Sequence, residues 1–476
     1  MLHLTPDENS PTPMSWPRLL SRRRYPEQPQ LHVVTDAPPV RGAFVQDYDR
    51  VVFSSAFRRL QRKTQVMPLP ETDFVHTRLT HALETASVGR SLGRLGGRLL
   101  LEESEELAAQ LPHLDSDFGD IVAAACLVHD IGNPPFGHSG EDAISAYFRS
   151  SAAEPFVRML TPAQRADLQQ FEGNAAGFRV LTHTYAAHSS GSAGLGLTYA
   201  TLGAFLKYPR PSISDETTLT GGISEQRYGY FQTEAPRFRE VARELGLLAR
   251  SATPDADVEA TAFCRHPLAF LVEAADDICY RIIDLEDGLR LGLIPAAEGL
   301  GLLRELLGDA PNRQGSVEWR DWREELGYLR ARLINRLVQQ TARLFADRAA
   351  ALLRGHADEP LVQQLDCWPQ LQEIGRLTRY YLYESRPVLE IEAAGFEVLA
   401  GLLHAFLHAT FDPQQSPRSR KLLQLLPAQF RAVGPQQEAT PYEQIILLTD
   451  YIGGLTDENA LSLFRTIHGT DLPGRL

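Results

Sequence analysis

The sequence predicts an all-α protein. Long stretches place apolar residues at the helical period, and no alternation of strand and helix patterns indicates a βαβ unit. We find no internal repeat. Of the 476 residues, 43% are hydrophobic and 22% are charged, which are ordinary values for a globular chain. The composition therefore excludes a disordered chain, a collagen and a small disulfide-stapled domain.

The N-terminal part combines a polar arm with a first helical region. Residues 1–40 are rich in proline and polar groups, which predicts an irregular arm. Helical periodicity begins at Asp47, and Pro68 and Pro70 interrupt it. This region should present one apolar face, formed by Val51, Phe53, Phe57 and Leu60.

The rest of the chain predicts further helices separated by turns and loops. The Gly132-Asn133-Pro134-Pro135 stretch is a strong helix stop. A Gly/Ser-rich loop is expected over residues 188–196, and the polar stretch of residues 209–231 is a candidate lid. We expect helices over residues 77–101, 120–130, 139–149, 171–184 and 266–292, then amphipathic helices from about 295 with loops near 308–316, 355–359, 411–418 and 433–440.

Charge and cysteine usage restrict the functional classes. Acidic residues number 60 and basic residues 47, so the net charge of −13 argues against coating nucleic acid with a basic surface. The four cysteines form no Cys-x-x-Cys pair, which is typical of buried thiols in a reducing compartment. Neither a signal peptide nor a membrane span is apparent, since the longest apolar run is residues 121–128. We therefore expect a soluble cytoplasmic protein.

The most informative motif is CLVHDIGNPPFGH. His129 and Asp130 end an apolar helix and precede the Gly-Asn-Pro-Pro turn. Because the preceding residues predict a buried helix, this polar pair needs compensation, which a divalent cation provides. Imidazole and carboxylate ligands suit manganese, iron, cobalt, zinc or magnesium.

One His-Asp pair does not hold a metal alone, and two further candidates lie on apolar helices. His81 lies within HTRLTHALE, and Asp276 lies within VEAADDICYRIIDLEDG. On the second helix Asp276, Tyr280 and Asp284 (or Asp287) share one face. Taken alone, a histidine in this setting is more typical of a core and an acidic stripe of a solvated face. The order His, His-Asp, Asp on apolar helices favours a metal site.

This order of residues resembles the HD superfamily of metal-dependent phosphohydrolases. Within it, the chain resembles the deoxyguanosine triphosphate triphosphohydrolase (dGTPase) family from about residue 41 to residue 460. The segments that carry the resemblance are FSSAFRRLQRKTQV, HTRLTHALE, HDIGNPPFGHSGE, FEGNAAGFRVL, LKYPRP, EAADDICYRIIDLEDG and DYIGGLTDENA.

The resemblance implies a domain organisation and an enzymatic activity. We expect an HD-domain catalytic core over residues 41–300, with a substrate loop around 185–231, and a C-terminal helical region over 301–476 that completes the nucleotide pocket. The implied reaction is hydrolysis of a deoxynucleoside triphosphate, above all dGTP, to the deoxynucleoside and inorganic triphosphate. Water attacks the α-phosphorus. Mg²⁺ or Mn²⁺ is the expected cofactor, with Co²⁺, Fe²⁺, Ni²⁺ and Zn²⁺ as alternatives.

The resemblance also assigns roles to individual residues. His138 and Glu141 form the catalytic pair, in which His138 either protonates the leaving 5′ oxygen or positions the nucleophile. Gln65 and Asp284 bind the sugar 3′-hydroxyl, and Tyr280 packs against the 2′ edge. The implied metal ligands are His81, His129, Asp130 and Asp276, and the implied phosphate contacts are Arg78, Asn174 and Lys207.

The resemblance further implies partners and leaves alternatives open. The family forms hexamers, and Arg418 and Arg420 could then reach a neighbouring subunit. Single-stranded DNA is a candidate effector; a basic run of Arg58, Arg59, Arg62 and Lys63 lies near the expected site, although such a run is usually a solvated face. The alternatives are a broad-specificity dNTP triphosphohydrolase, an HD phosphohydrolase of another nucleotide, and a non-catalytic module that senses nucleotides or binds single-stranded DNA.

Overall fold

The computed structural model is helical throughout its described parts. It describes residues 12–26, 41–66, 75–183, 194–213, 222–250, 262–308, 319–431 and 439–471. These ranges contain 20 α-helices, and their only β-type pairings are isolated bridges. The prediction of an all-α fold is therefore confirmed. None of the helices in these ranges combines the length and apolar character needed to cross a membrane.

Two helices that pack closely together form the centre of the fold. They are α4 (Arg78–Glu103) and α6 (Leu114–Val128). Gly93 and Gly97 on α4 permit this approach, since a Cβ at Gly93 would lie 2.6 Å from the Phe118 carbonyl oxygen. Two long helices, α13 (Pro267–Arg290) and α15 (Trp322–Leu353), pack against α4. Three of these helices carry or directly precede the expected metal ligands, since His81 lies on α4, Asp276 lies on α13, and His129 and Asp130 follow α6.

The remaining helices complete the fold around these four. Their bounds are α1 Trp16–Leu19, α2 Ala43–Phe53, α3 Ser55–Arg59, α5 Glu105–Gln110, α7 Gly137–Arg149, α8 Glu154–Val157, α9 Pro162–Gln169, α10 Gly173–Thr182, α11 Tyr199–Phe205, α12 Ala235–Leu245, α14 Ala296–Leu307, α16 Trp368–Thr378, α17 Arg386–Thr410, α18 Pro417–Leu425, α19 Pro441–Gly453 and α20 Asp457–His468. Short helical turns are η1 Leu60–Arg62, η3 Ile223–Glu225, η4 Val362–Gln364, η5 Arg379–Tyr383 and η6 Ala428–Phe430.

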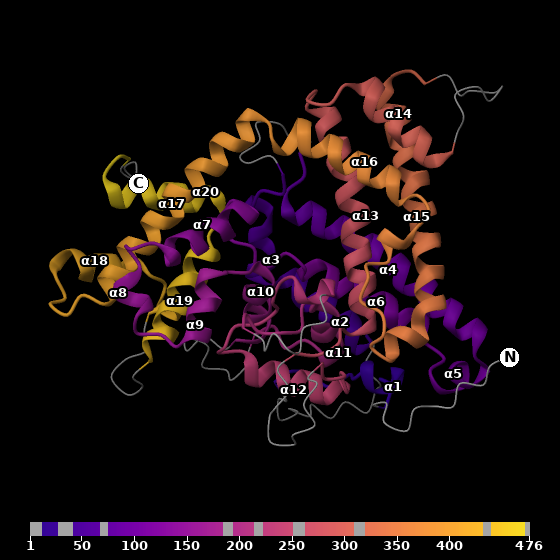
Figure 1. Cartoon of the computed structure of the whole chain (residues 1–476), viewed down its shortest axis with the longest axis horizontal. Helices are drawn as coiled ribbons and strands as arrows, with labels where there is room; N and C mark the ends of the chain where they lie inside the picture. Colours follow the sequence, from indigo (N-terminus) through magenta and orange to yellow (C-terminus); the bar gives the residue numbers. More distant parts are fainter. Residues whose placement is uncertain are drawn as a thin grey trace.

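The described residues form two apolar cores. The larger core includes α4, α6, α13 and α15, and the smaller includes α7–α9 and α17–α20. In Figure 1 these two groups of helices gather on opposite sides of the molecule. Ile131 belongs to the larger core and Phe136 to the smaller. The turn after His129 and Asp130 therefore lies where the two cores meet.

The N-terminal elements differ from the expectation in one respect. Helix α2 ends at Phe53, and the Ser54 side chain caps α3, so the chain bends where a continuous apolar face was predicted. As a result Phe53 is 72% exposed, and its assignment to that buried face was wrong. Within the expected arm, residues 16–19 form α1, and the Trp16 ring lies 4.7 Å from the Phe118 ring.

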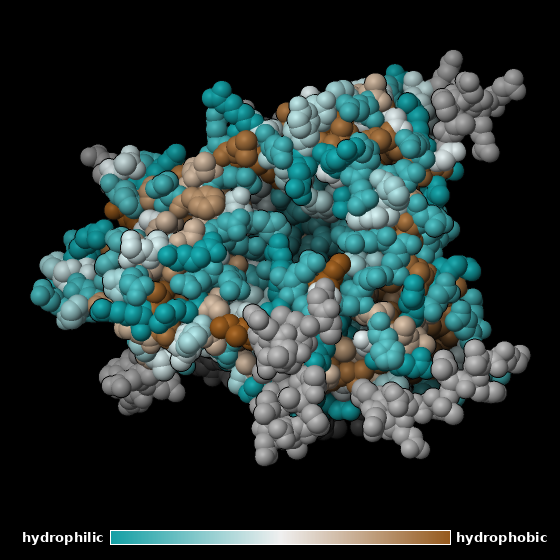
Figure 2. Space-filling model, in the orientation of Figure 1, coloured by the Kyte–Doolittle hydropathy of each residue, from teal (hydrophilic) through white to brown (hydrophobic). Residues whose placement is uncertain are grey.

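Parts of several predicted loops lie outside the described residues. These are residues 184–193 and 214–221 of the expected substrate loop, residues 309–318, and residues 432–438. The described surface is mostly hydrophilic on the face shown in Figure 2, which is hollowed near its middle.

Candidate metal centre and active site

The structure brings the four predicted metal ligands together from three helices. His81 lies on α4, His129 and Asp130 follow α6 directly, and one ligand atom from each of these three lies within 4.8 Å of the others. Asp276, on α13, places Oδ1 3.2 Å from His81 Nε2 and 3.4 Å from His129 Nε2. Both histidines are buried. Residues almost 200 positions apart thus converge on one point.

The protonation of the cluster fits a divalent cation. His129 Nδ1 lies 2.7 Å from the Cys126 carbonyl oxygen, so this nitrogen donates to the carbonyl, and in the neutral imidazole Nε2 carries the lone pair that can bind a metal. His129 Nε2 is buried without a hydrogen-bond partner. Burial lowers the pKa of His129, but the Asp130 and Asp276 carboxylates raise it above its ordinary value. The surroundings therefore favour positive charge here, which a metal ion supplies in place of a proton.

Two cationic side chains border the cluster. Arg78 Nη1 donates to Asp130 Oδ2, and Lys207 Nζ donates to Asp276 Oδ2 at 2.8 Å. Asn133 Nδ2 donates to the other Asp130 oxygen at 2.7 Å. Burial opposes ionisation of Asp130, but Arg78 and His129 hold the pKa of this carboxyl well below its usual range. Arg78 and Lys207, the predicted phosphate contacts, thus lie beside the predicted metal ligands.

The turn after the metal pair depends on close backbone packing. A Cβ at Gly132 would lie 2.0 Å from the Gly177 nitrogen and 2.2 Å from the Gly173 carbonyl oxygen, both on α10. No other residue fits there without moving α10. Since α10 in turn contacts Glu141 through the Gly173 nitrogen, this approach connects the turn after His129 and Asp130 to Glu141, a member of the predicted catalytic pair.

The predicted catalytic pair forms on the first turn of α7. His138 Nδ1 lies 3.0 Å from Glu141 Oε2. Glu141 Oε1 accepts from the Gly173 backbone nitrogen at 2.9 Å, which fixes the carboxylate. The hydrogen bond with Glu141 raises the pKa of His138. The His138 side chain is 70% exposed, so its ring is accessible to a substrate.

Asn174 occupies a more indirect position than the sequence suggested. Its amide nitrogen donates to Glu172 Oε1 at 2.7 Å. Arg227 Nη1 binds the same carboxylate at 3.2 Å and lies 3.6 Å from Glu141 Oε2. The sequence did not reveal Arg227, because it lies in a polar segment without a period. Arg227 adds a cation beside Glu141 of the His138–Glu141 pair.

Two acidic residues of α13, Asp284 and Asp287, contact different partners. The Tyr383 hydroxyl donates to Asp284 Oδ2, and the Tyr280 and Tyr383 rings stack with centroids 5.9 Å apart. Asp287 instead lies 2.6 Å from His76 Nδ1. Burial raises the pKa of Asp284 to about 8. Sequence reasoning also missed Tyr383, which lies in no recognised motif, and His76, although His76 is the first residue of the HTRLTHALE segment.

Gln65 and the residues of the neighbouring basic run have different surroundings. Gln65 Oε1 is buried and has no hydrogen-bond partner. Arg58 lies over the Phe53 ring and Arg62 pairs with Glu458 on the surface, as expected for solvated charge. Lys63 differs, because it is 4% exposed and its burial lowers its pKa to about 7.

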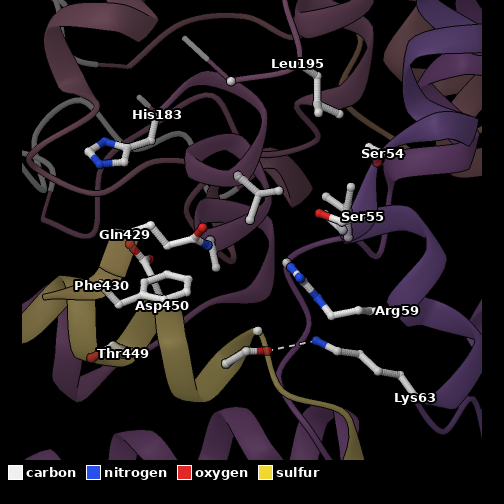
Figure 3. A pocket seen from close by; sticks show the side chains of 18 of the residues that line it. Ser54, Ser55, Arg59, Lys63, His183, Leu195, Gln429, Phe430, Thr449 and Asp450 are labelled. Atoms are coloured by element: carbon white, nitrogen blue, oxygen red, sulfur yellow. Dashed lines mark hydrogen bonds between the residues drawn. The ribbon is translucent and has the colours of Figure 1, made fainter. Parts of the chain in front are cut away.

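A cavity of about 240 Å³ adjoins the turn that follows His129 and Asp130 (Figure 3). None of the predicted metal ligands lines it, but Ile131 and Gly132 do. Its other lining residues include Ser54, Ser55, Arg59, Lys63, Phe171, His183, Phe430 and Asp450. The predicted metal ligands therefore do not form the wall of this cavity.

Comparison with known proteins supports a relationship along nearly the whole chain. The HD domain family model matches residues 78–196, a range that contains His81, His129 and Asp130. A deoxyguanosinetriphosphate triphosphohydrolase-like protein of Synechocystis is 43% identical, covering 96% of this chain and 100% of its own length. One from Pseudomonas aeruginosa is 40% identical, covering 97% and 100%. A deoxyguanosinetriphosphate triphosphohydrolase of Klebsiella pneumoniae is 31% identical, covering 94% and 97%.

Proposed function

Because the chain belongs to the deoxyguanosinetriphosphate triphosphohydrolase family of HD-domain proteins, we propose that it hydrolyses dGTP to deoxyguanosine and inorganic triphosphate in a metal-dependent reaction. The observation that carries this proposal is the convergence of His81, His129, Asp130 and Asp276 beside two cationic side chains. In the reaction, the oxygen of water bonds to the α-phosphorus and the bond from this phosphorus to the 5′ oxygen breaks.

The four converging residues would hold the metal. Their imidazole nitrogens and carboxylate oxygens suit Mg²⁺ or Mn²⁺, and also Co²⁺, Fe²⁺, Ni²⁺ or Zn²⁺. When bound, such a cation acts as a Lewis acid and lowers the pKa of a water molecule. The buried His129 Nε2, which makes no hydrogen bond and faces Asp276 Oδ1 at 3.4 Å, is the clearest structural support for a ligand at this place.

Arg78 and Lys207 would bind the triphosphate. Arg78 Nη1 contacts Asp130, but Arg78 Nε is buried without a partner and remains available as a donor. A guanidinium group can therefore hold the carboxylate and a phosphate oxygen at the same time. Lys207 contributes a compact positive charge on the opposite side of the cluster, next to Asp276.

His138 would carry the proton of the reaction. Glu141 occupies the Nδ1 side of the ring, which leaves Nε2 to protonate the leaving 5′ oxygen. Since Glu141 raises the pKa of His138, more of the imidazole is protonated at neutral pH than in an isolated histidine. The same geometry is also compatible with holding the attacking water.

The α13 face would select the sugar. Gln65 and Asp284 would bind the 3′-hydroxyl, and Tyr280, stacked on Tyr383, would close the 2′ edge. A ribose 2′-hydroxyl would lose its water there without gaining a hydrogen bond, at a cost of about 1–3 kcal/mol.

The direct test is a product analysis. We would incubate the protein with each of the four dNTPs and with GTP, in Mn²⁺ or Mg²⁺, and separate the products by anion-exchange chromatography. The proposal expects triphosphate and deoxyguanosine from dGTP. Formation of pyrophosphate and dGMP would contradict the mechanism, and equal rates on all four dNTPs would favour the broad-specificity alternative.

A matched pair of variants tests the metal site itself. Asp130→Asn removes one charge from the cluster, and Asp117→Asn removes a carboxylate that pairs with Arg22 at 3.0 Å on the surface. We expect only the first to lose bound Mn²⁺, measured by elemental analysis, together with triphosphate release. Retention of both in Asp130→Asn would exclude this site.

A further inference from the structure

Phe136 adopts a backbone conformation that L-residues rarely occupy. Its φ is 65°, and Gly137 follows with a φ of 59°. For a residue with a side chain this left-handed region costs about 1–2 kcal/mol. Phe136 directly precedes α7, whose first turn carries His138 and Glu141. The orientation of the His138 and Glu141 side chains therefore depends on contacts that keep Phe136 in this conformation.

Asp457 makes the contact that does so. Its Oδ1 accepts the Phe136 backbone N–H at 3.1 Å, although 321 residues separate the two. Its Oδ2 accepts the Thr64 backbone N–H at 2.9 Å and also the Thr64 hydroxyl. Asp457 is 2% exposed. One buried carboxylate thus joins the start of α7 to the residue next to Gln65.

Lys63 makes a second connection at the same place. It donates to the Asn133 carbonyl at 2.5 Å and to the Gly453 carbonyl at 2.8 Å. Figure 3 shows its side chain reaching the end of α19. Asn133 also binds Asp130 through its side chain. Gly453, at the end of α19, is therefore connected to the turn after the metal pair through Lys63, and Asp457, at the start of α20, contacts the turn directly.

The Phe136 side chain is held as well. Its ring packs against Gly395 on α17, where a Cβ would lie 2.9 Å from Phe136 Cγ. Backbone and side chain of Phe136 are thus both fixed by C-terminal helices. The catalytic turn cannot relax to an ordinary conformation while these contacts persist.

We propose that Asp457 is a positioning residue, which orients the His138–Glu141 pair through Phe136 and orients Gln65 through Thr64. This inference rests on the proposed function, since it assigns these residues to dGTP hydrolysis. An acidic residue in the first turn of α20 also stabilises that helix. That ordinary role needs no contact with Phe136 or Thr64, so the two can be separated experimentally.

The first experiment compares two buried carboxylates. Asp457→Asn keeps the shape but turns an amide N–H toward one of the existing donors. Asp47→Asn is the control, because Asp47 is 0% exposed and also accepts a backbone N–H and a hydroxyl from Thr198, at 3.0 and 2.6 Å. Asp47 pairs with Arg24 at 2.5 Å as well, so general destabilisation should be at least as large in this variant. We expect Asp457→Asn to lower kcat for triphosphate release about 10- to 100-fold, and Asp47→Asn to leave kcat within about twofold of the wild type.

Two results would overturn the inference. One is a kcat for Asp457→Asn within about twofold of the wild type. The other is an equal loss in both variants, which would indicate general destabilisation. Failure of the wild type to release triphosphate would instead refute the proposed function, so the two failures are distinguishable.

A second pair of variants does not depend on Asp457 tolerating a change. Thr64→Val removes only the hydroxyl donor, and Thr64→Ser retains it. We expect Thr64→Val to raise KM for dGTP about 10-fold through Gln65, and Thr64→Ser to remain close to the wild type. Equal KM values for the two variants would contradict the role assigned to this contact.

Discussion

Replacing Lys207 with methionine should destabilise the metal-free protein more than the manganese-bound protein. Lys207 Nζ lies 2.8 Å from Asp276 Oδ2, and the two side chains are only 12% and 26% exposed. With an effective dielectric constant of about 20, Coulomb's law gives an attraction of about 6 kcal/mol at this distance. Desolvation offsets part of it, and removing one partner of such a pair costs about 3–5 kcal/mol.

A metal ion changes this balance. With Mn²⁺ held by Asp276 and the other ligands, the carboxylate retains a cation after Lys207 is lost. We therefore expect Lys207→Met to lower the free energy of unfolding by about 3–5 kcal/mol in EDTA and by roughly 1 kcal/mol in Mn²⁺. Methionine preserves most of the side-chain length, so lost packing contributes little.

The assay is urea unfolding followed by circular dichroism, with and without Mn²⁺. Lys421→Met is the control, because Lys421 is an exposed lysine on α18. It should change stability little in either condition. Equal destabilisation of Lys207→Met in EDTA and in Mn²⁺ would refute the reasoning, since Asp276 would then not be a metal ligand.

Four further predictions concern catalysis, selectivity and packing. His138→Ala should lower kcat about 10²- to 10⁴-fold, as expected for loss of a general acid. Glu141→Gln should move the basic limb of the kcat–pH profile to lower pH. Glu141 raises the pKa of His138, so without the carboxylate His138 loses its proton at a lower pH. An unchanged profile would argue against the His138–Glu141 pair. Tyr280→Ala should reduce the kcat/KM preference for dGTP over GTP about 10-fold in parallel assays, and an unchanged ratio would assign discrimination elsewhere. Phe118→Ala should destabilise the protein by about 3–5 kcal/mol in urea unfolding, since Phe118 is fully buried against Trp16; a loss below about 1 kcal/mol would contradict this packing.

Much of the fold could be predicted because helical signals are local. The long helix expected over residues 266–292 is α13, at Pro267–Arg290, and α6 ends at Val128, shortly before the Gly-Asn-Pro-Pro stretch that begins at Gly132. The error at Phe53 has a local cause as well. Apolar periodicity continues across Ser54, and only its capping hydrogen bond to the Phe57 nitrogen reveals the break.

The candidate site shows a similar division. His81, His129, Asp130 and Asp276 could be predicted as a group, because each lies in an apolar helix that makes an uncompensated polar residue conspicuous. Tyr383 could not, since 99 residues separate it from Asp284 and its segment has no distinctive spacing. Its role depends on where η5 packs.

By itself, the sequence determined the helical class, the positions of the main helices and the donor atoms of the predicted metal ligands, because periodicity and residue type act over a few residues. Only the tertiary structure decided that Lys63 is buried, that Tyr383 donates to Asp284 and that Asp457 holds Phe136. These contacts join residues far apart in the chain. Their partners are chosen by the packing of whole helices, and no local pattern encodes that choice.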